Sequence, residues 1–593
     1  MHTILPQGQY QMFREQTKEW IKKSWKTSQD AAELTKIQSF KLNPEHPPLG
    51  KRDESGLIPK YVAESFDRNQ MAHKLIKSMV GEFHGPDGMK KAGGVTSSLG
   101  YNFYDLRAPV ELSYPVNVPF RNSLPRIGRV NDGYGVAAHW QATRNPGILY
   151  AGVSEGQRAA TATPDDNAYI ATYKELGVER AVTFTAEFAG EGYADNLADE
   201  HLRGLHELWL QEEGLMLLGN SGTSTGNNGF QLGTAATPTL VATAATAAYP
   251  AASAGFPAAT NVSVACVYLT GMGNPANAQY GYGTFPTVAN GLTPTYQRTN
   301  ADGSKNTING GISVISAMST VVATSSGNRN ITASVPVGTK GVFGYAWYVD
   351  IADASTGNVA NAYLYAITQF PTVVINGAPA GTQNGSALGT TDYSAQPLDF
   401  DGLLTYVAST PGATWTDLGG ASLTSSKNGR VVEIETILQS IFTQYQAGID
   451  AIWGSADAVT ALDQAVRYSG TGASGFQFIT TRDGQGNLLG GFLVSGYQSR
   501  YAVANPTGAN VISIHIHPMI PPGTLFFDCA TNPYPHSRAP FTRGMLVQRD
   551  YYSIEWPIVT RNWTFGTYVH EVLAHHFPWI SAVLTGIGPF VGN

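Results

Sequence analysis

Histidines near the C-terminus are the side chains best placed, by type and spacing, to bind a metal. The segment HEVLAHH, His570–His576, invites comparison with the H-E-x-x-H helix of zinc peptidases. That motif needs two histidines four residues apart, so that both lie on one helical face with the glutamate as base. Here His575 and His576 lie five and six residues after His570, which puts the rings on different faces. The spacing therefore argues against a zinc site.

Two other patterns that could carry chemistry are also incomplete. His515 and His517 alternate along an expected strand, so both rings point to one face, but no third ligand lies nearby in sequence. The glycine-rich segment Gly222–Gly229 lacks the Lys-Ser/Thr pair of a phosphate-binding loop. We find no convincing nucleophile–base set in the sequence. We therefore expect no enzyme and no catalytic, cofactor-binding or metal residues; a metallohydrolase with β accessory domains is the enzymatic alternative.

The segment Gly147–Asn220 combines a polar ribbon with a long helix. Two extended arms flank a turn-rich tip at Thr163–Asn167, and residues from Ala181 to Ala186 continue the second arm with the period of a strand. The first arm and the tip offer little apolar surface, and an isolated two-stranded ribbon is marginally stable in water. The ribbon, about residues 136–186, is therefore expected to lie on a surface that the chain itself need not supply, which indicates assembly.

A helix follows the ribbon at about residues 195–218. Asp195 is a candidate N-cap, and Gly219 is a stop signal. Taken alone, the pattern is typical of an amphipathic helix on a core. The apolar residues near helical spacing are Leu197, Leu202, Leu205, Leu208, Trp209, Leu215 and Met216.

The ribbon and helix belong to a longer ordered series of segments. An extended, strand-like segment at Leu106–Arg126 comes first. It is followed by the hairpin that contains AGVSEGQR, the strand AVTFTAEFAGEGY and the helix that ends in LGN. Near the C-terminus come the strand and Pro-Gly turn of Ile514–Phe527 and the closing segment Met545–Pro578. In order and spacing, about residues 100–235 and 380–593 resemble the major capsid proteins of tailed bacteriophages, which share the Hong Kong 97-type capsid fold.

The resemblance implies an α+β fold built from an N-terminal arm, an extended β-hairpin loop, a peripheral domain with a long spine helix, and an axial domain. The arm corresponds to residues 1–105, the first part of the capsid fold to 106–235 and the second part to 379–593. Gly429–Ala447 and Ser455–Val466 have the pattern of amphipathic helices and fit the axial domain.

Composition changes between residues 236 and 378, where the chain is rich in Ala, Thr, Ser, Gly and Val and almost free of charge. Short strands separated by turn clusters are typical of an inserted Ig- or fibronectin-like β-sandwich. A long, poorly ordered surface loop is the alternative. Several phage capsid proteins resemble this chain in carrying such an insertion, which we expect to face outward. The expected strands are Asn261–Leu269, Ser313–Ala323, Asn330–Val337, Gly341–Val349 and Asn361–Phe370.

Length and composition fit a structural protein better than a typical enzyme. The 593 residues suffice for several domains, and only 14% of them are charged. Cys266 and Cys529 lie in apolar, strand-like runs and are expected to be buried thiols in a reducing compartment. The N-terminus lacks the apolar core of a signal peptide, and no run reaches the ~18 apolar residues that span a membrane. We expect no membrane partner.

Charge is unevenly distributed along the chain. Residues 1–91 carry a net charge of +4, from 15 basic and 11 acidic residues, whereas the remainder carries −11. A more basic arm under an acidic shell suits a container whose arm faces packaged double-stranded DNA. A solvated, partly helical arm is the alternative.

Together these features predict a major capsid protein. It would assemble with itself, as hexamers and pentamers, into the icosahedral virion capsid around double-stranded DNA, with portal, scaffold and cement or decoration proteins as further partners. A non-viral, encapsulin-like compartment is the alternative on the same fold. Charged residues on or beside the ribbon are expected at contacts between subunits. They are Arg144, Glu155, Arg158, Asp165, Asp166 and Lys174.

Some relatives of this family join a ribbon lysine to an asparagine of a neighbour, with a glutamate as base. That chemistry needs an uncharged amine and hence a desolvated lysine. The ribbon tip has Arg158 but no lysine, and Lys174 lies on the returning arm beside Glu175, a charged setting that favours the protonated amine. No lysine follows Lys427. We therefore predict a non-covalent shell.

Overall fold

The computed structural model divides the chain into two units, residues 1–106 and 107–593, and every described residue lies in the second. The expected N-terminal arm is outside the described residues, so its contact with DNA stays a prediction. The described residues are 117–128, 135–145, 152–190, 195–222, 229–244, 255–257, 259–273, 287–325, 328–352, 357–426, 429–467, 494, 496–501, 511–534 and 541–590.

A four-stranded sheet supports the first part of the fold. Its order is β1–β19–β20–β4, with β1 parallel to β19 and the other neighbours antiparallel. The sheet therefore pairs the strand that follows the ribbon with the closing segment of the chain. The strands are β1 Arg126–Ile127, β4 Lys174–Thr183, β19 Arg543–Glu555 and β20 Asn562–His575.

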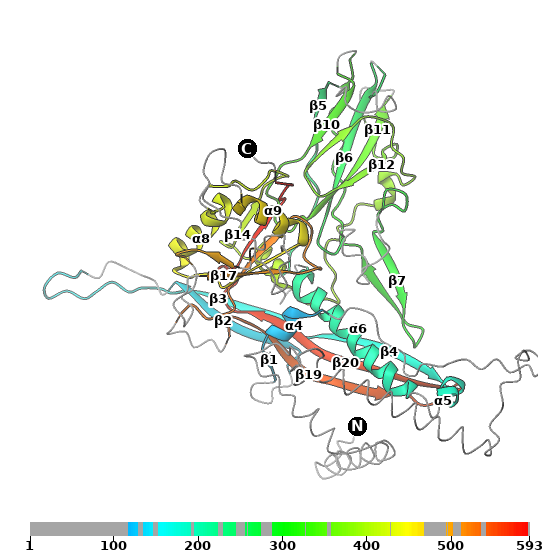
Figure 1. The fold of residues 1–593 in the computed structure, drawn as a ribbon, viewed down its shortest axis with the longest axis vertical. Coiled ribbons are helices and arrows are strands. Elements are labelled where there is room, and N and C mark those ends of the chain that lie inside the picture. Colours follow the sequence, from blue (N-terminus) through cyan, green and yellow to red (C-terminus); the bar gives the residue numbers. More distant parts are fainter. Residues whose placement is uncertain are drawn as a thin grey trace, which may run out of the picture. The chain divides into compact units, whose positions relative to one another are not determined.

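The long helix α6, Asn196–Leu218, packs along this sheet against β4 and β20 (Figure 1). The Asp195 side chain caps its first turn by accepting the Ala198 N–H at 3.0 Å. The helix ends at Gly219, where only glycine fits because a Cβ would lie 2.1 Å from the backbone oxygen of Phe400. Both predicted ends of the helix are confirmed.

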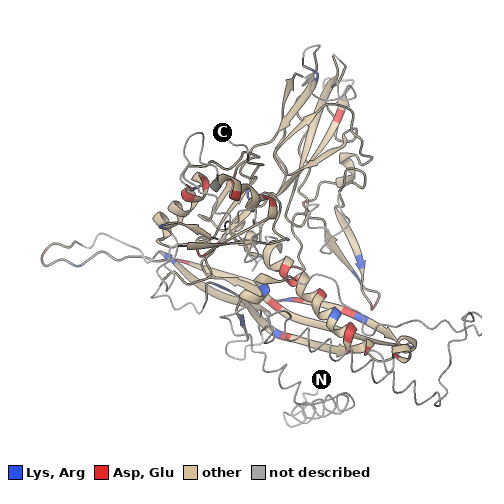
Figure 2. Ribbon diagram, viewed as in Figure 1, with Lys and Arg blue, Asp and Glu red and all other residues tan. Residues whose placement is uncertain are grey.

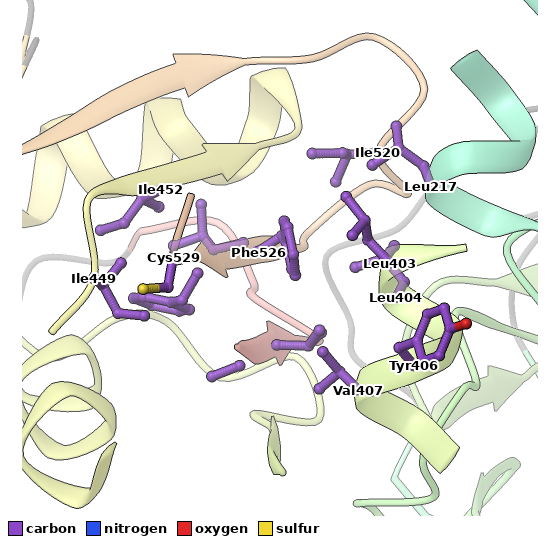
Figure 3. Packing of buried hydrophobic residues seen from close by; sticks show 14 of the residues in the cluster. Leu217, Leu403, Leu404, Tyr406, Val407, Ile449, Ile452, Ile520, Phe526 and Cys529 are labelled. Atoms are coloured by element: carbon purple, nitrogen blue, oxygen red, sulfur yellow. The ribbon is translucent and has the colours of Figure 1, made fainter. Parts of the chain in front are cut away.

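A second, six-stranded sheet has the order β14–β21–β18–β15–β17–β16. One apolar core joins this sheet to helices α7, α8 and α9 and to the end of α6, where Leu217 lies near Leu403 and Phe526 (Figure 3). The two predicted amphipathic helices are confirmed as α8 and α9, and their place in an axial domain stays a prediction. The elements are α4 Pro119–Ser123, α7 Leu403–Ser409, α8 Val432–Tyr445, α9 Ala456–Arg467, β14 Thr414–Asp417, β15 Ala451–Gly454, β16 Gly496–Gln498, β17 Val511–Ile516, β18 Leu525–Asp528 and β21 Ala582–Thr585.

The expected insertion contains two facing sheets with a core of their own. Sheets β13–β10–β5 and β12–β11–β6–β9 enclose an apolar cluster that includes Val264, Ile331 and Trp347. Two sheets around one core are consistent with the expected sandwich, and its Ig-like assignment stays a prediction. The strands are β5 Thr239–Thr243, β6 Asn261–Leu269, β9 Val322–Ala323, β10 Asn330–Ser334, β11 Gly344–Ala352, β12 Tyr363–Thr368 and β13 Thr372–Ile375, with a separate hairpin of β7 Thr295–Thr299 and β8 Lys305–Asn309.

One segment expected to be a strand, Ser313–Ala323, is a strand only in its last two residues. Ser313, Ser316 and Ser319 instead accept N–H groups of β6 through their hydroxyl oxygens, at 2.9 to 3.0 Å. Their own N–H groups donate to β6 carbonyls at 2.9 Å. The segment thus advances three residues for every two of β6, which no regular strand pairing allows. We call these three residues the serine ladder.

We predict that residues 229–396 fold alone. Leu388 and Tyr393 pack on the second face of the four-stranded sheet, so the domain extends beyond the boundary at residue 378. The longer fragment should give a β-type circular dichroism spectrum and a cooperative melt, and the 236–378 fragment should melt at a lower temperature. A longer fragment that is unfolded would contradict this prediction.

Candidate functional site

The ribbon is shorter than its sequence indicated. β2 and β3 pair antiparallel, and the loop between them turns at Ser154–Gln157, where the Gln157 N–H donates to the Ser154 carbonyl at 3.0 Å (Figure 1). The predicted tip at Thr163–Asn167 is wrong, because Asp165 begins β3 and is already paired with β2. The strands are β2 Ala137–Asn145 and β3 Asp165–Thr172.

The base of the ribbon packs on its own chain. The Trp140 indole N–H donates to the His575 carbonyl at 3.0 Å, and the Trp140 and Tyr169 rings stack with centroids 5.7 Å apart. Ala138 and Ala171 are buried beside them. Burial also raises the pKa of Tyr169 to about 12. The expectation that the chain would not supply a surface for the ribbon is therefore wrong for its base.

The outer part of the ribbon lacks such support, since every residue from 152 to 166 is exposed. No described residue forms a hydrogen bond or ion pair with the side chains of Glu155, Arg158 and Asp165, although the Asp165 backbone pairs with β2. Asp166 accepts a local hydrogen bond from the Thr143 hydroxyl at 2.7 Å. Four of the predicted contact residues thus lie together on one uncovered arm.

Arg144 lies at the outer end of the paired strands, level with Asp165 and Asp166, but its contacts differ from theirs. Its guanidinium donates to the Tyr445 hydroxyl at 3.2 Å and lies 5.6 Å from the centroid of that ring. The Tyr445 hydroxyl in turn donates to the Gly412 carbonyl at 2.8 Å. These contacts tie the ribbon to α8 of the same chain, so Arg144 orients the arm.

Lys174 is the predicted contact residue whose surroundings differ most from expectation. Its ammonium donates to the Pro397 carbonyl at 2.6 Å, and burial lowers its pKa, with Asp401 and Asp399 opposing the shift. The Asp399 carboxyl is itself buried, which raises its pKa to about 8. The expectation that Glu175 governs the charge of Lys174 is therefore wrong. The ribbon's lysine is tethered to its own chain and is partly desolvated.

The histidines do not form a metal centre. The HEVLAHH segment lies on and just after strand β20, so its spacing cannot be helical. His575 is fully buried, which lowers its pKa to about 3, and His517 is buried beside Trp453 while His515 is exposed. No group of three or more potential metal ligands exists in the described part of the chain. Likewise, no described helix is long and apolar enough to cross a membrane.

The two cysteines meet their expectation. Cys266 and Cys529 are both free and buried. Burial raises the pKa of each thiol well above its usual value. Both side chains therefore act as small apolar core residues.

An exposed apolar patch at the far end of the long sheet was not predicted. β4 ends at Thr183, opposite the start of β20, and helix α5, Phe184–Gly190, begins where a strand was expected to continue to Ala186. The patch spans α5 and the β19–β20 turn. In the sequence, the mixture of apolar residues and proline after Glu555 is the signal that could have predicted it. We call it the distal patch: Phe188, Trp556, Ile558, Val559 and Trp563, exposed between 38% and 90%.

No family model matches this chain, and no curated protein matches it. Solved capsid structures are similar to it. The capsid of a native GTA particle is 8% identical, with a TM-score of 0.35, over 84% of this chain and 99% of that one. The mature capsid of bacteriophage PhiM1 is 7% identical, with a TM-score of 0.32, over 85% and 98%. An encapsulin from Synechococcus elongatus is 12% identical, with a TM-score of 0.20, over 32% and 57%.

We predict that assembled particles contain no covalent bonds between subunits. The Lys174 amine is held by Pro397 of its own chain, and the exposed arm from 152 to 166 has no lysine. Particles boiled in detergent should give a single band near 63 kDa. A ladder of multimers that resists detergent and reductant would contradict this prediction.

Proposed function

We propose that this chain is the major capsid protein of a tailed double-stranded DNA bacteriophage. Many copies assemble as hexamers and pentamers into the icosahedral shell of the virion. The observation that carries the proposal is the ribbon, whose base is anchored in the core while residues 152–166 are wholly exposed. Ordering such an arm costs conformational entropy that its own contacts do not offset, whereas a neighbouring subunit can cover it.

The distal patch supports the same proposal from the other end of the long sheet. It brings two tryptophans, a phenylalanine and two aliphatic side chains together on the surface, with Val559 90% exposed. The Phe184 and Trp563 rings pack edge to face, with their centroids 5.1 Å apart, and this contact holds the patch together. Exposed apolar clusters of this kind mark surfaces that bind protein. An arm at one end and an apolar patch at the other give each subunit two separate surfaces for neighbours.

The remaining partners follow from the shell. Packaged DNA binds non-specifically on the lumenal side through the arm of residues 1–105, which is the basic part of the chain. The insertion faces outward, where it leaves the contacts between subunits free. Portal, scaffold and cement proteins are further partners. The role is mechanical and needs no catalytic group.

Deleting the exposed loop tests the ribbon. Replacing residues 146–164 with an Asn-Gly turn closes β2 and β3 as a short hairpin and keeps Trp140 and Tyr169 in the core. We expect a subunit with an unchanged melting temperature that forms no particles in sedimentation and electron microscopy. Arg158→Lys, which keeps the charge of the arm, should still assemble. Normal particles from the loop-deleted chain would refute the role of the ribbon.

A charge in the distal patch tests the second surface. Val559→Asp should reduce assembly about tenfold or more for each contact, because a buried valine contributes about 1.5–3 kcal/mol. Val241→Asp is the matched control, since Val241 is 55% exposed on the outer sheet of the insertion. Particle yield by sedimentation distinguishes the two variants. Equal yields would show that the patch is not a contact.

A further inference from the structure

Buried acidic side chains gather where the end of α6 meets the long sheet. Figure 2 shows charged residues along α6 and the strands beside it, whereas the insertion is mostly uncharged. Glu212 and Glu213 of α6 and Glu571 of β20 are each fully buried. A buried carboxylate is stable only where cations or hydrogen-bond donors offset its lost hydration. The three carboxyls differ sharply in how well they are paired.

Glu212 is fully paired. One carboxylate oxygen accepts a hydrogen bond from the Arg126 guanidinium. The other accepts from the Arg121 Nε at 3.2 Å and from the Tyr551 hydroxyl. These donors come from α4, β1 and β19, so the Glu212 charge holds four elements together.

Glu213 is also satisfied, but without a direct salt bridge to an arginine. It accepts the backbone N–H groups of Phe120 at 2.8 Å and Arg121 at 2.7 Å, and the His517 Nε2 at 2.8 Å. The Nδ1 of His517 accepts the Met519 N–H at 3.1 Å, which leaves the proton on Nε2 and the ring neutral. The neutral imidazole therefore adds no positive charge to the cluster.

Glu571 lacks comparable pairing. It has one cationic contact, to Arg126 at 2.8 Å, and neither of its oxygens accepts a hydrogen bond from a donor in the described residues. Lys174 is its register partner on β4, but that ammonium donates to a loop carbonyl instead. Arg126 is shared with Glu212 and with the exposed Asp550, at 3.2 Å. The Glu571 and Glu212 carboxyls interact with each other while sharing the Arg126 guanidinium, and two buried carboxyls around one cation favour the uptake of one proton.

We propose that Glu571 carries this proton in the folded protein, and that its loss as the pH rises loosens α6 from the β19–β20 sheet. Glu212 has donors for both oxygens, so the proton resides on the poorly paired partner. Once both carboxyls are ionised, two buried negative charges face one shared guanidinium. The pair is thus a proton-dependent latch between the helix and the sheet. This latch does not depend on the proposed function.

The direction of the pKa shift agrees with this geometry. Burial raises the pKa of Glu571 well above its usual value, the Glu212 charge raises it further, and Arg126 opposes both. A group whose pKa is higher in the folded than in the unfolded chain binds its proton more tightly when folded. Its stabilising effect is complete below the unfolded pKa of about 4.3 and is lost as the pH rises through the folded value.

The Glu571→Gln variant of the full chain tests the latch. Glutamine has the shape of the protonated glutamate but cannot ionise. We expect the melting temperature of the wild type to fall more steeply than that of the variant as the pH rises above about 4.3, with the two curves converging below that pH. Asp399 also has a raised pKa, but it is present in both proteins, so its contribution to the pH dependence of the melting temperature cancels in the comparison. Parallel curves would overturn the proposal.

Two further measurements separate the latch from general destabilisation. Asp550→Asn removes an exposed carboxylate from Arg126 and should keep the pH dependence of the wild type. Amide hydrogen exchange can be measured on the wild type alone. Base catalysis speeds exchange in every helix as the pH rises. Beyond that shared increase, the exchange rate of residues 212–218 of α6 should rise more at alkaline pH than that of α8. Equal acceleration in the two helices would refute a local latch even if Glu571→Gln failed to fold.

Discussion

The pairing of β20 with both β19 and β4 is the interaction on which the other elements depend. β20 lies in the middle of the long sheet, and its strand neighbours come from opposite ends of the described chain. The Leu573 carbonyl accepts the Tyr406 hydroxyl at 2.9 Å, and the His575 carbonyl accepts the Trp140 indole. α7 and the ribbon are therefore both fixed on one strand. Because these contacts are so far apart in sequence, the fold is complete only when the C-terminal segment has docked.

Local signals predicted the elements whose ends are set by their own residues. Asp195 and Gly219 bound α6 through contacts within one turn, the Asp195 cap and the hydrogen bond from the Gly219 N–H to the Leu215 carbonyl. The start of α5 at Phe184 was missed because the strand pattern continues past it, and only the end of the β20 pairing at Asn562 stops β4. The serine ladder was missed for a similar reason: a short, largely apolar segment between turns suggests a strand, and serine hydroxyls can replace a backbone ladder only beside the right neighbour.

The candidate site was predictable in part. The charges of Glu155 and Arg158 lie on an exposed arm, as their polar surroundings suggested. Lys174 was misread because Glu175 is its neighbour in sequence, whereas burial lowers its pKa and the Asp401 and Asp399 carboxyls that oppose this shift lie more than two hundred residues away. The cluster around Glu571 could not be foreseen either, since four elements meet there and none of them carries a motif.

The serine ladder affects how the edge of this sheet can pair with strands of other molecules. A sheet edge with free N–H and C=O groups invites a strand from another molecule. On this side β6 has its groups occupied by Ser313, Ser316 and Ser319 in a three-to-two register. An incoming strand repeats every two residues and cannot match the outer face of such a segment. This edge of the insertion is therefore closed to strand exchange with another copy of the chain.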